Sequence, residues 1–254
     1  MTVTGKIIEQ LRAAGCVFAE DEARLLLDAA TTPDGLTAMV QRRVGGEPLE
    51  QILGWAEFSG LRVAVEPGVF VPRQRSALLV REAASLAPQH PVVLDLCCGS
   101  GALGAALAAT VGPMELYAAD IDPAAVRCAR RNVPGAVLQG DLFEPVPDQV
   151  RGGVDILLAN VPYVPAAAIA SLPPEAREHE PRAALDGGTD GLDVLRRVSA
   201  GAADWLAPGG HVLSETGTAQ ASMGAAILTG DGLAGEVVHD AESGATIVVG
   251  TRSS

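Results

Sequence analysis

Apolar residues recur at helical spacing through the first 45 residues of the chain. They form three groups: Ile7, Ile8 and Leu11, then Ala23, Leu25, Leu26 and Ala29, then Leu36, Met39 and Val40. This periodicity predicts about three short helices over residues 3–45. Between residues 52 and 71 the pattern changes to alternation at Leu61, Val63 and Val65, with glycines and a proline around it. Alternation of this kind predicts a β-hairpin.

From residue 91 onward, apolar runs of strand length alternate with helical segments. The predicted strands cover residues 91–96, 115–119, 135–138, 154–159, 210–214, 235–238 and 245–250. Such alternation is typical of a mainly parallel sheet with helices on both faces. Only residues 240–244 separate the last two strands, too few for a crossover helix, so these strands are expected to pair as an antiparallel hairpin. The sequence therefore predicts an α/β fold with a seven-stranded sheet that ends in an antiparallel hairpin.

The change of pattern also predicts how the chain is divided. Residues 1–51 are expected to form a small helical N-terminal domain, residues 52–72 a hairpin linker, and residues 73–254 the α/β domain. A chain of 254 residues with 48% hydrophobic residues can bury a sizeable core and fits two unequal domains.

Charge and composition narrow the possible partners. The formal net charge of −13 argues against a broad phosphate-binding surface, so no direct sequence-specific contact with nucleic acid is expected. No apolar run approaches the roughly 18 residues of a membrane-spanning helix, and charged residues interrupt the N-terminal segment where a secretory signal is continuous. The four cysteines are too few for a disulfide framework and lack zinc-ligand spacing. We expect a soluble, cytoplasmic protein without membrane contact, with reduced thiols and no metal site.

A glycine turn follows the first predicted strand of the sheet. Residues 92–96 run directly into this turn, which contains Gly99 and Gly101. In a doubly wound sheet, ligands bind beyond the carboxyl ends of the strands where the strand order reverses, and that point follows the first strand. The glycines would let the backbone approach a ligand closely, and a helix beginning near residue 102 would present free amides toward it.

Acidic residues accompany three successive predicted strands. Asp120 ends the second strand, where it is well placed to accept hydrogen bonds from both hydroxyls of a ribose. Asp141 ends the third, where its carboxylate and the amide of Leu142 are placed to bind an adenine edge. Together these features predict a nucleotide-like cofactor. The predicted cofactor contacts are Asp95, Cys97, Gly99, Gly101, Asp120, Ile121, Asp141, Leu142 and Asn160.

An amide side chain and an aromatic ring follow the buried-type strand at residues 154–159. The residues are Asn160, Val161, Pro162 and Tyr163, and we expect them beside the glycine turn. An amide nitrogen is a poor nucleophile because its lone pair is delocalised into its carbonyl group. Acceptors on its two hydrogens would orient it and increase its electron density, and the Asn160 side-chain oxygen and the Val161 carbonyl are the predicted acceptors. Tyr163 is expected to pack its ring against the reacting group.

In combination, these motifs resemble the HemK/PrmC family of protein-(glutamine-N5) methyltransferases, and the likeness covers almost the whole chain. The motifs that carry it lie at residues 47–54, 70–73, 95–101, 120, 141–142, 160–163, 180–181 and 184–188. The resemblance implies a class I methyltransferase fold, S-adenosylmethionine as cofactor, and methylation of a glutamine side-chain nitrogen in a release factor or related translation protein. It also implies that the N-terminal domain recognises the substrate. The catalytic residues implied are Asn160, Val161, Pro162 and Tyr163, and the substrate contacts are Asn160, Val161, Tyr163, Glu180 and Pro181.

The chain departs from the family pattern at three places. The family's Asn-Pro-Pro-Tyr motif has Val161 at its second position here, and Cys97 stands where a glycine is common. Residues 74–77 replace the family's usual proline, acidic and threonine residues. The chain therefore resembles a divergent branch of the family.

Other interpretations of the same motifs stay open. The acceptor nitrogen could belong to a small metabolite that carries an amide or amine, or to adenine in a nucleic acid, although the overall acidity counts against the latter. A glycine turn followed by a ribose-binding acid also occurs in nicotinamide oxidoreductases. A binding protein that retains only the fold is a further alternative. The oligomeric state is not indicated, and a monomer is the default expectation.

Overall fold

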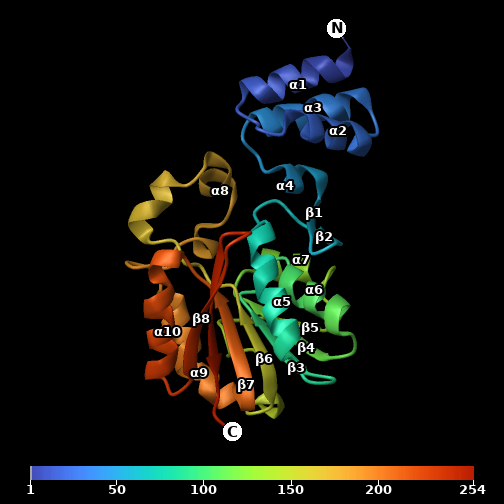
Figure 1. Cartoon of the computed structure of the whole chain (residues 1–254). Coiled ribbons are helices and arrows are strands. Elements are labelled where there is room, and N and C mark those ends of the chain that lie inside the picture. Colours follow the sequence, from blue (N-terminus) through green and yellow to red (C-terminus); the bar gives the residue numbers. More distant parts are fainter. Residues whose placement is uncertain (1) are drawn as a thin grey trace.

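The computed structural model describes residues 2–254 and begins with a group of helices that pack on one another (Figure 1). The helices are α1 (Val3–Ala13), α2 (Ala19–Ala29), α3 (Pro33–Val44) and the short α4 (Leu49–Leu53). Thr2 and Thr32 begin α1 and α3, because their hydroxyls accept hydrogen bonds from the amides of Gly5 and Gly35. The three predicted helices are confirmed. Helix α4 was not predicted, since five residues are too few to show a helical period.

A short hairpin connects these helices to the rest of the chain. Its strands, β1 (Trp55–Phe58) and β2 (Leu61–Ala64), pair antiparallel. The hairpin is confirmed, but it is shorter than the predicted span of residues 52–71. Helix α4 occupies residues 49–53, and after Val65, whose amide donates to the carbonyl of Gly54, the chain leaves the hairpin. Phe58 is fully buried and joins the hairpin to the core of the sheet.

The remaining residues build a seven-stranded sheet with the order β5-β4-β3-β6-β7-β9-β8. The pairs β5–β4, β4–β3, β3–β6 and β6–β7 are parallel, whereas β9 pairs antiparallel with both β7 and β8. The predicted seven strands and final antiparallel hairpin are confirmed. The strands are β3 (Val92–Leu96), β4 (Glu115–Asp120), β5 (Ala136–Gln139), β6 (Val154–Ala159), β7 (Leu206–Glu215), β8 (Ala234–Asp240) and β9 (Ala245–Thr251).

Strands β7 and β8 differ most from their predicted bounds. Strand β7 begins at Leu206 rather than 210, and β8 extends from Ala234 to Asp240 rather than over 235–238. The added residues of β7 include a proline and a glycine, and most of β8 is exposed. Proline, glycine and exposed residues do not show the apolar pattern of a strand. The ends of β7 and β8 are therefore defined by backbone pairing with the neighbouring strands.

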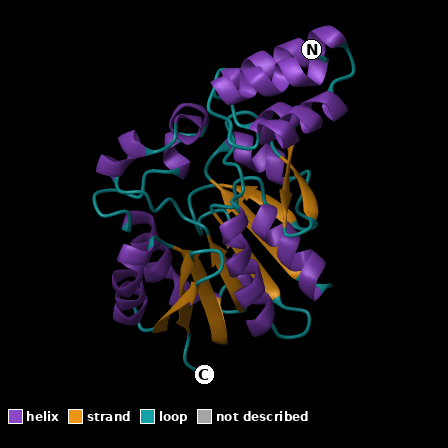
Figure 2. Cartoon of the chain, turned by 45° about the horizontal axis from the view of Figure 1, so that its top comes forward, coloured by secondary structure: helices purple, strands orange, loops and turns teal. Residues whose placement is uncertain are grey.

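Helices cover both faces of the sheet (Figure 2). Helices α5 (Ala77–Leu86), α6 (Ala102–Val111) and α7 (Pro123–Ala129) pack on one face, against Val93, Ile156 and Leu158. Helices α9 (Asp193–Trp205) and α10 (Ala221–Gly230) pack on the other, against Leu94, Leu96 and Leu157. Neighbouring residues of one strand therefore enter different cores, as the two-residue period of a strand requires. The short 3-10 turns η1 (Gln74–Ser76), η2 (Asp148–Val150) and η5 (Thr218–Gln220) complete this part of the chain.

A long connection between β6 and α9 rises above the sheet beside α4 (Figure 1). We call residues 164–186 the wall segment; it contains η3 (Ala166–Ser171), α8 (Pro174–His179) and η4 (Arg182–Ala184). Its two ends meet at the bridge between Val164 and Asp186. The buried guanidinium of Arg43 in α3 binds Glu22 of α2 at 2.6 Å and also pairs with Glu175 of α8. The N-terminal helices therefore hold the wall segment in place.

Within residues 2–254, every helix is either too short or too polar to cross a membrane.

Candidate active site

A cavity of about 410 Å³ lies where β3, β4 and β6 end. Strand order reverses at β3, whose neighbours are β4 on one side and β6 on the other, so this is the position at which open α/β sheets bind ligands. Residues 69–76 form one side of the cavity and the wall segment forms another. The volume suits a small-molecule ligand.

The turn after β3 holds its backbone open toward this cavity. Gly99 has φ +55° and Gly101 has φ +77°, which is the left-handed region that favours glycine. A Cβ atom on Gly101 would lie 2.4 Å from Cγ2 of Val133, whereas one on Gly99 would meet nothing within 4 Å. Gly101 is therefore required for packing, and Gly99 leaves free space for a ligand.

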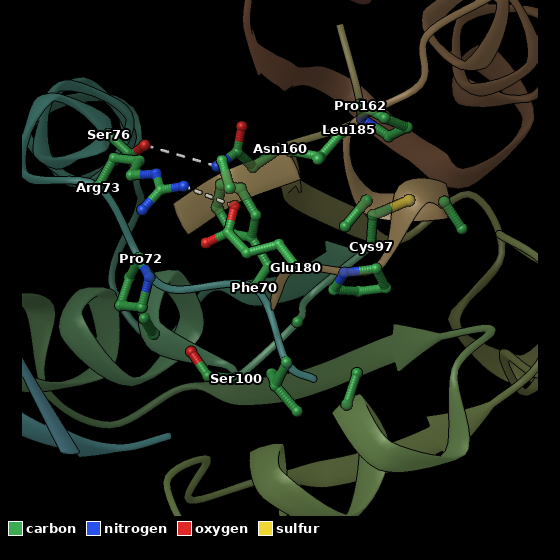
Figure 3. A pocket seen from close by; sticks show the side chains of 18 of the residues that line it. Phe70, Pro72, Arg73, Ser76, Cys97, Ser100, Asn160, Pro162, Glu180 and Leu185 are labelled. Carbon is green, nitrogen blue, oxygen red and sulfur yellow. Dashed lines mark hydrogen bonds and ion pairs between the residues drawn. The ribbon is translucent and has the colours of Figure 1, made fainter. Parts of the chain in front are cut away.

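Cys97 occupies a third left-handed position of this turn, with φ +53°. A side chain there costs about 1–2 kcal/mol, which explains why a glycine is common at this point. Burial raises the pKa of its thiol, with Asp120 adding to the effect, so the thiol stays protonated at neutral pH. Cys97 thus lines the cavity as a small uncharged group and lacks the thiolate of a nucleophile (Figure 3).

Asp120 ends β4 and ties the turn to the cavity. Its Oδ2 atom accepts from the amide of Gly99 at 2.8 Å, and its Oδ1 atom accepts from the amide of Asp122 at 2.9 Å. Burial raises the pKa of this carboxyl despite these hydrogen bonds. Ile121, which follows it, is 60% exposed and lines the cavity. A carboxylate and an apolar surface at this place match the ribose and base of a nucleoside.

Asp95 lies directly behind the turn and is fully buried. Its Oδ2 atom accepts from the amide of Gly104 at 3.0 Å, but its Oδ1 atom has no hydrogen-bond partner in the part of the chain that the structure describes. Burial raises the pKa of this carboxyl to about 7, and the nearby Asp120 adds to the effect. An ionised carboxylate oxygen without a partner is costly when buried, which agrees with the raised pKa of Asp95.

Replacing Asp95 by asparagine is expected to stabilise the ligand-free chain at neutral and alkaline pH. The folded-state pKa of about 7 lies above the ordinary value, so the unfolded chain releases this proton at lower pH than the folded chain does. The protonated Asp95 carboxyl contributes fully to the free energy of unfolding below the pKa of the unfolded chain. This contribution is lost as the pH rises through the pKa of the folded chain.

Asparagine does not titrate, so it avoids this loss. The gain in free energy of unfolding should be about 2 kcal/mol larger near pH 8.5 than near pH 5.5. Urea unfolding of both chains at the two pH values measures it. An equal gain at both pH values would show that Asp95 does not titrate between them.

The residues after β6 lie beside the glycine turn, because β6 is the parallel neighbour of β3. Asn160 places its Nδ2 atom 3.5 Å from the hydroxyl of Ser76. Val161 is buried in the core, and within residues 2–254 its carbonyl accepts no backbone hydrogen bond. The Tyr163 hydroxyl donates to Oε1 of Glu215 at 2.7 Å and accepts from Arg75 at 2.6 Å. Burial and the Glu215 carboxylate raise the pKa of Tyr163, so its hydroxyl stays protonated.

Glu180 connects the wall segment to the residues just before η1. Its carboxylate accepts from the amide of Val71 at 3.1 Å and from Nη2 of Arg73 at 2.6 Å (Figure 3). Its side chain is fully buried, and burial raises its pKa although Arg73 opposes the effect. Glu180 therefore closes one side of the cavity, and Pro181 extends the same side.

Most of the predicted site residues meet in this cavity. Those that line it are Cys97, Gly99, Asp120, Ile121, Asn160, Val161, Pro162, Tyr163, Glu180 and Pro181. Asp95 and Gly101 support the turn from behind. Asp141 and Leu142 do not line the cavity, and the Asp141 carboxylate instead pairs with Arg197 at 2.7 Å. Whether these residues bind a ligand stays a prediction.

Ser76 and Glu215 are two residues of the site that the sequence did not single out. Glu215 ends β7 next to the end of β6, and its carboxylate accepts from the Ser76 hydroxyl and from Nε of Arg75. The signal was a polar run that follows the apolar end of β7, at the same edge of the sheet as Asn160. No group of three or more residues that could hold a metal ion occurs among those described.

Comparison with known proteins agrees with this geometry. A family model described as "Methyltransferase small domain" matches residues 60–172. The release factor glutamine methyltransferase of Geobacter sulfurreducens is 39% identical, over 89% of this chain and 81% of that protein. The one of Mycolicibacterium smegmatis is 35% identical, over 98% of this chain and 91% of that protein. A 4-amino-L-phenylalanine/4-methylamino-L-phenylalanine methyltransferase of Streptomyces pristinaespiralis is 35% identical, over 87% and 78%.

Among solved structures, a 16S rRNA methyltransferase of T. thermophilus in complex with AdoMet and guanosine has the same fold. Its TM-score is 0.56 at 22% identity, over 78% of this chain and 49% of that one. The sequence similarity to the curated relatives extends over nearly the whole chain, from the N-terminal helices to the final hairpin. This chain therefore belongs to the release factor glutamine methyltransferase family and is an S-adenosylmethionine-dependent methyltransferase.

Proposed function

We propose that this enzyme methylates the side-chain amide nitrogen of a glutamine in a peptide chain release factor. The observation that carries the proposal is the position of residues 160–163, which share one cavity with the glycine turn and Asp120. A carboxamide and an unpaired backbone carbonyl next to a nucleoside-shaped pocket suit a flat amide that must be held beside a methyl donor.

The residues around the turn fit S-adenosylmethionine. Asp120 would bind the ribose hydroxyls and Ile121 would cover the base. The space beside Gly99, where a Cβ atom would meet nothing within 4 Å, would be filled by the ligand. The unpaired Oδ1 atom of Asp95 offers a partner for a cationic group behind the turn. Cys97, Gly101 and Asn160 complete the proposed set, whereas Asp141 and Leu142 stay outside it because neither lines the cavity. When bound, S-adenosylmethionine supplies a methyl carbon that its sulfonium already activates.

Asn160 and Val161 act on the acceptor nitrogen. Oδ1 of Asn160 and the carbonyl of Val161 accept the two hydrogens of the glutamine amide, which fixes the plane of the amide and directs its nitrogen toward the methyl carbon. Such alignment is worth roughly 7–11 kcal/mol of the barrier. Both hydrogen bonds strengthen as positive charge develops on the nitrogen, so they stabilise the transition state more than the bound substrate.

No strong base is required for this transfer. The excess proton leaves to water after the new carbon–nitrogen bond has formed. Pro162 restricts the backbone at the point where the Val161 carbonyl must stay fixed. Tyr163, Glu180 and Pro181 form the surface against which the glutamine side chain packs.

The division of labour along the chain follows the same proposal. Residues 1–51 recognise the protein substrate, and residues 52–72 link them to the catalytic domain. Residues 73–254 bind the cofactor and catalyse methyl transfer. The contact between Arg43 and Glu175 supports a joint role of the N-terminal helices and the wall segment in admitting the substrate. We further propose that the enzyme is cytoplasmic and monomeric.

A free amine on a small molecule is the second candidate acceptor. It is supported by the similarity to the aminophenylalanine methyltransferase and by Val161 in place of the family's usual proline. An aryl amine is also flat and carries two hydrogens, so the same two acceptors would hold it.

Labelled S-adenosylmethionine distinguishes the two acceptors. The purified enzyme is incubated with a release factor, with the same factor after replacement of the glutamine in its Gly-Gly-Gln loop by alanine, and with 4-amino-L-phenylalanine. We expect label in the first sample alone, with one added methyl group located on that glutamine by mass spectrometry. Label on the amino acid and none on the release factor would support the second candidate and overturn the first.

A further inference from the structure

The two ends of the Asn160 carboxamide have different surroundings. Its Nδ2 atom faces the hydroxyl oxygen of Ser76 at 3.5 Å, at the long end of the hydrogen-bond range (Figure 3). Its Oδ1 atom accepts no hydrogen bond from any residue between 2 and 254. Only this orientation of the Asn160 carboxamide leaves its oxygen free to accept from a substrate amide. The contacts that hold the carboxamide in this orientation therefore affect the reaction.

Ser76 can only accept on the side that faces Asn160. It is 2% exposed, and its single hydroxyl hydrogen is donated to Oε2 of Glu215. Lone pairs therefore remain for Asn160. Turning the carboxamide over would place its oxygen against these lone pairs, which repel it, whereas the Nδ2 hydrogens are attracted.

Glu215 is itself held in place from three sides. Its side chain is 3% exposed, and its Oε1 atom accepts from Nε of Arg75 at 2.8 Å and from the Tyr163 hydroxyl at 2.7 Å. Together with the Ser76 hydroxyl on Oε2, these donors engage both carboxylate oxygens. One carboxylate thus fixes Tyr163 directly and Asn160 through Ser76.

We propose that Ser76 and Glu215 are positioning residues for methyl transfer: Glu215 orients the Ser76 hydroxyl, and Ser76 orients the Asn160 carboxamide with its oxygen toward the acceptor nitrogen. Neither residue touches the reacting atoms. The proposal rests on the proposed function of Asn160 and assigns its orientation to two specific neighbours.

Ser76→Ala is the test, with Ser76→Thr as the variant that keeps the hydroxyl. We expect Ser76→Ala to lower kcat about 10-fold, the effect of one hydrogen bond, with the Kd of S-adenosylmethionine almost unchanged. The Tm should fall by a few degrees, because Oε2 of the buried Glu215 loses its donor, so kcat is measured well below the Tm of both enzymes. Ser76→Thr should recover most of the loss. In an Asn160→Ala background, Ser76→Ala should have no further effect, because residues that act through one another are not additive. Ser85→Ala, at an exposed hydroxyl bonded within α5, is the matched control.

A second readout does not depend on activity. The side-chain amide signals of Asn160 in a ¹⁵N NMR spectrum are identified by their loss in Asn160→Asp, and Ser76→Ala should shift them where Ser85→Ala does not. Unchanged signals, or equal kcat losses in the wild-type and Asn160→Ala backgrounds, would overturn the positioning role. If the wild-type enzyme methylates no release factor while the signals shift as expected, the acceptor assignment fails and the positioning role stands.

Discussion

Asn160→Ala is expected to lower kcat for methyl transfer by about 10² or more, the scale of losing one preorganised polar group at the reacting centre. The Asn160 oxygen is the proposed acceptor for one amide hydrogen, and alanine offers nothing in its place. The Kd of S-adenosylmethionine should change only a few-fold, because Asp120, Ile121 and the glycine turn are untouched. Single-turnover transfer and calorimetric titration measure the two quantities separately.

Asn160→Gln provides the matched control for this prediction. It keeps the carboxamide but moves it outward by one methylene group, so it loses alignment without losing polarity. We expect it to be nearly as slow as the alanine variant, since positioning is the proposed source of the effect. A turnover of the alanine variant close to that of the parent enzyme would remove Asn160 from the reaction. A glutamine variant as fast as the parent would show instead that exact positioning is not the source of the effect.

Asp120→Ala is expected to raise the Kd of S-adenosylmethionine by about 10² or more. Two ribose hydroxyls would lose charge-assisted hydrogen bonds, each worth about 1.5–3 kcal/mol. The turn would also lose the contact that holds the Gly99 amide. At saturating cofactor, kcat should stay within a few-fold of the parent value, because Asp120 is not proposed to contact the acceptor nitrogen.

The control for Asp120→Ala is Asp155→Asn. Asp155 accepts from the amide of Val92 at 2.8 Å, at the start of β3 and β6 and thus at the opposite edge of the sheet. It should leave the cofactor affinity unchanged.

Because burial raises the pKa of Asp120, the affinity of the parent enzyme for S-adenosylmethionine should fall on the acidic side at a higher pH than it would for an exposed aspartate. An unchanged Kd for Asp120→Ala would exclude the residue from the cofactor site.

The parts of this structure that local patterns encode could be predicted. Alternation of apolar strands with helices indicated the seven strands, and the five residues between the last two indicated their antiparallel pairing. The carboxyl ends of β3, β4 and β6 then had to meet at one edge of the sheet, which brought Asp120 and Asn160 to the same cavity.

Contacts between distant residues could not be predicted in this way. Ser76 and Glu215 are 139 positions apart and meet only because η1 is placed above the end of β7. Asp141 has the spacing expected of a cofactor residue, yet Arg197 of α9 binds its carboxylate and it does not line the cavity. The pattern along the chain shows at which edge of the sheet a residue lies. The neighbours of its side chain depend on how the helices and strands pack against one another.

The ion pair between Arg43 and Glu175 has a consequence for how acceptor docking and transfer are coupled. On the proposed function, an acceptor protein that binds the N-terminal helices also affects the wall segment through this ion pair, and a substrate held by the wall segment affects binding at the helices equally, because such linkage is reciprocal. A catalytic fragment lacking residues 1–51 would lose the Arg43–Glu175 ion pair and, on the proposed role of these residues, the surface that binds the substrate. If residues 1–51 recognise the acceptor as proposed, selectivity has to be measured on the intact polypeptide, because a truncated enzyme would lack part of the recognition surface.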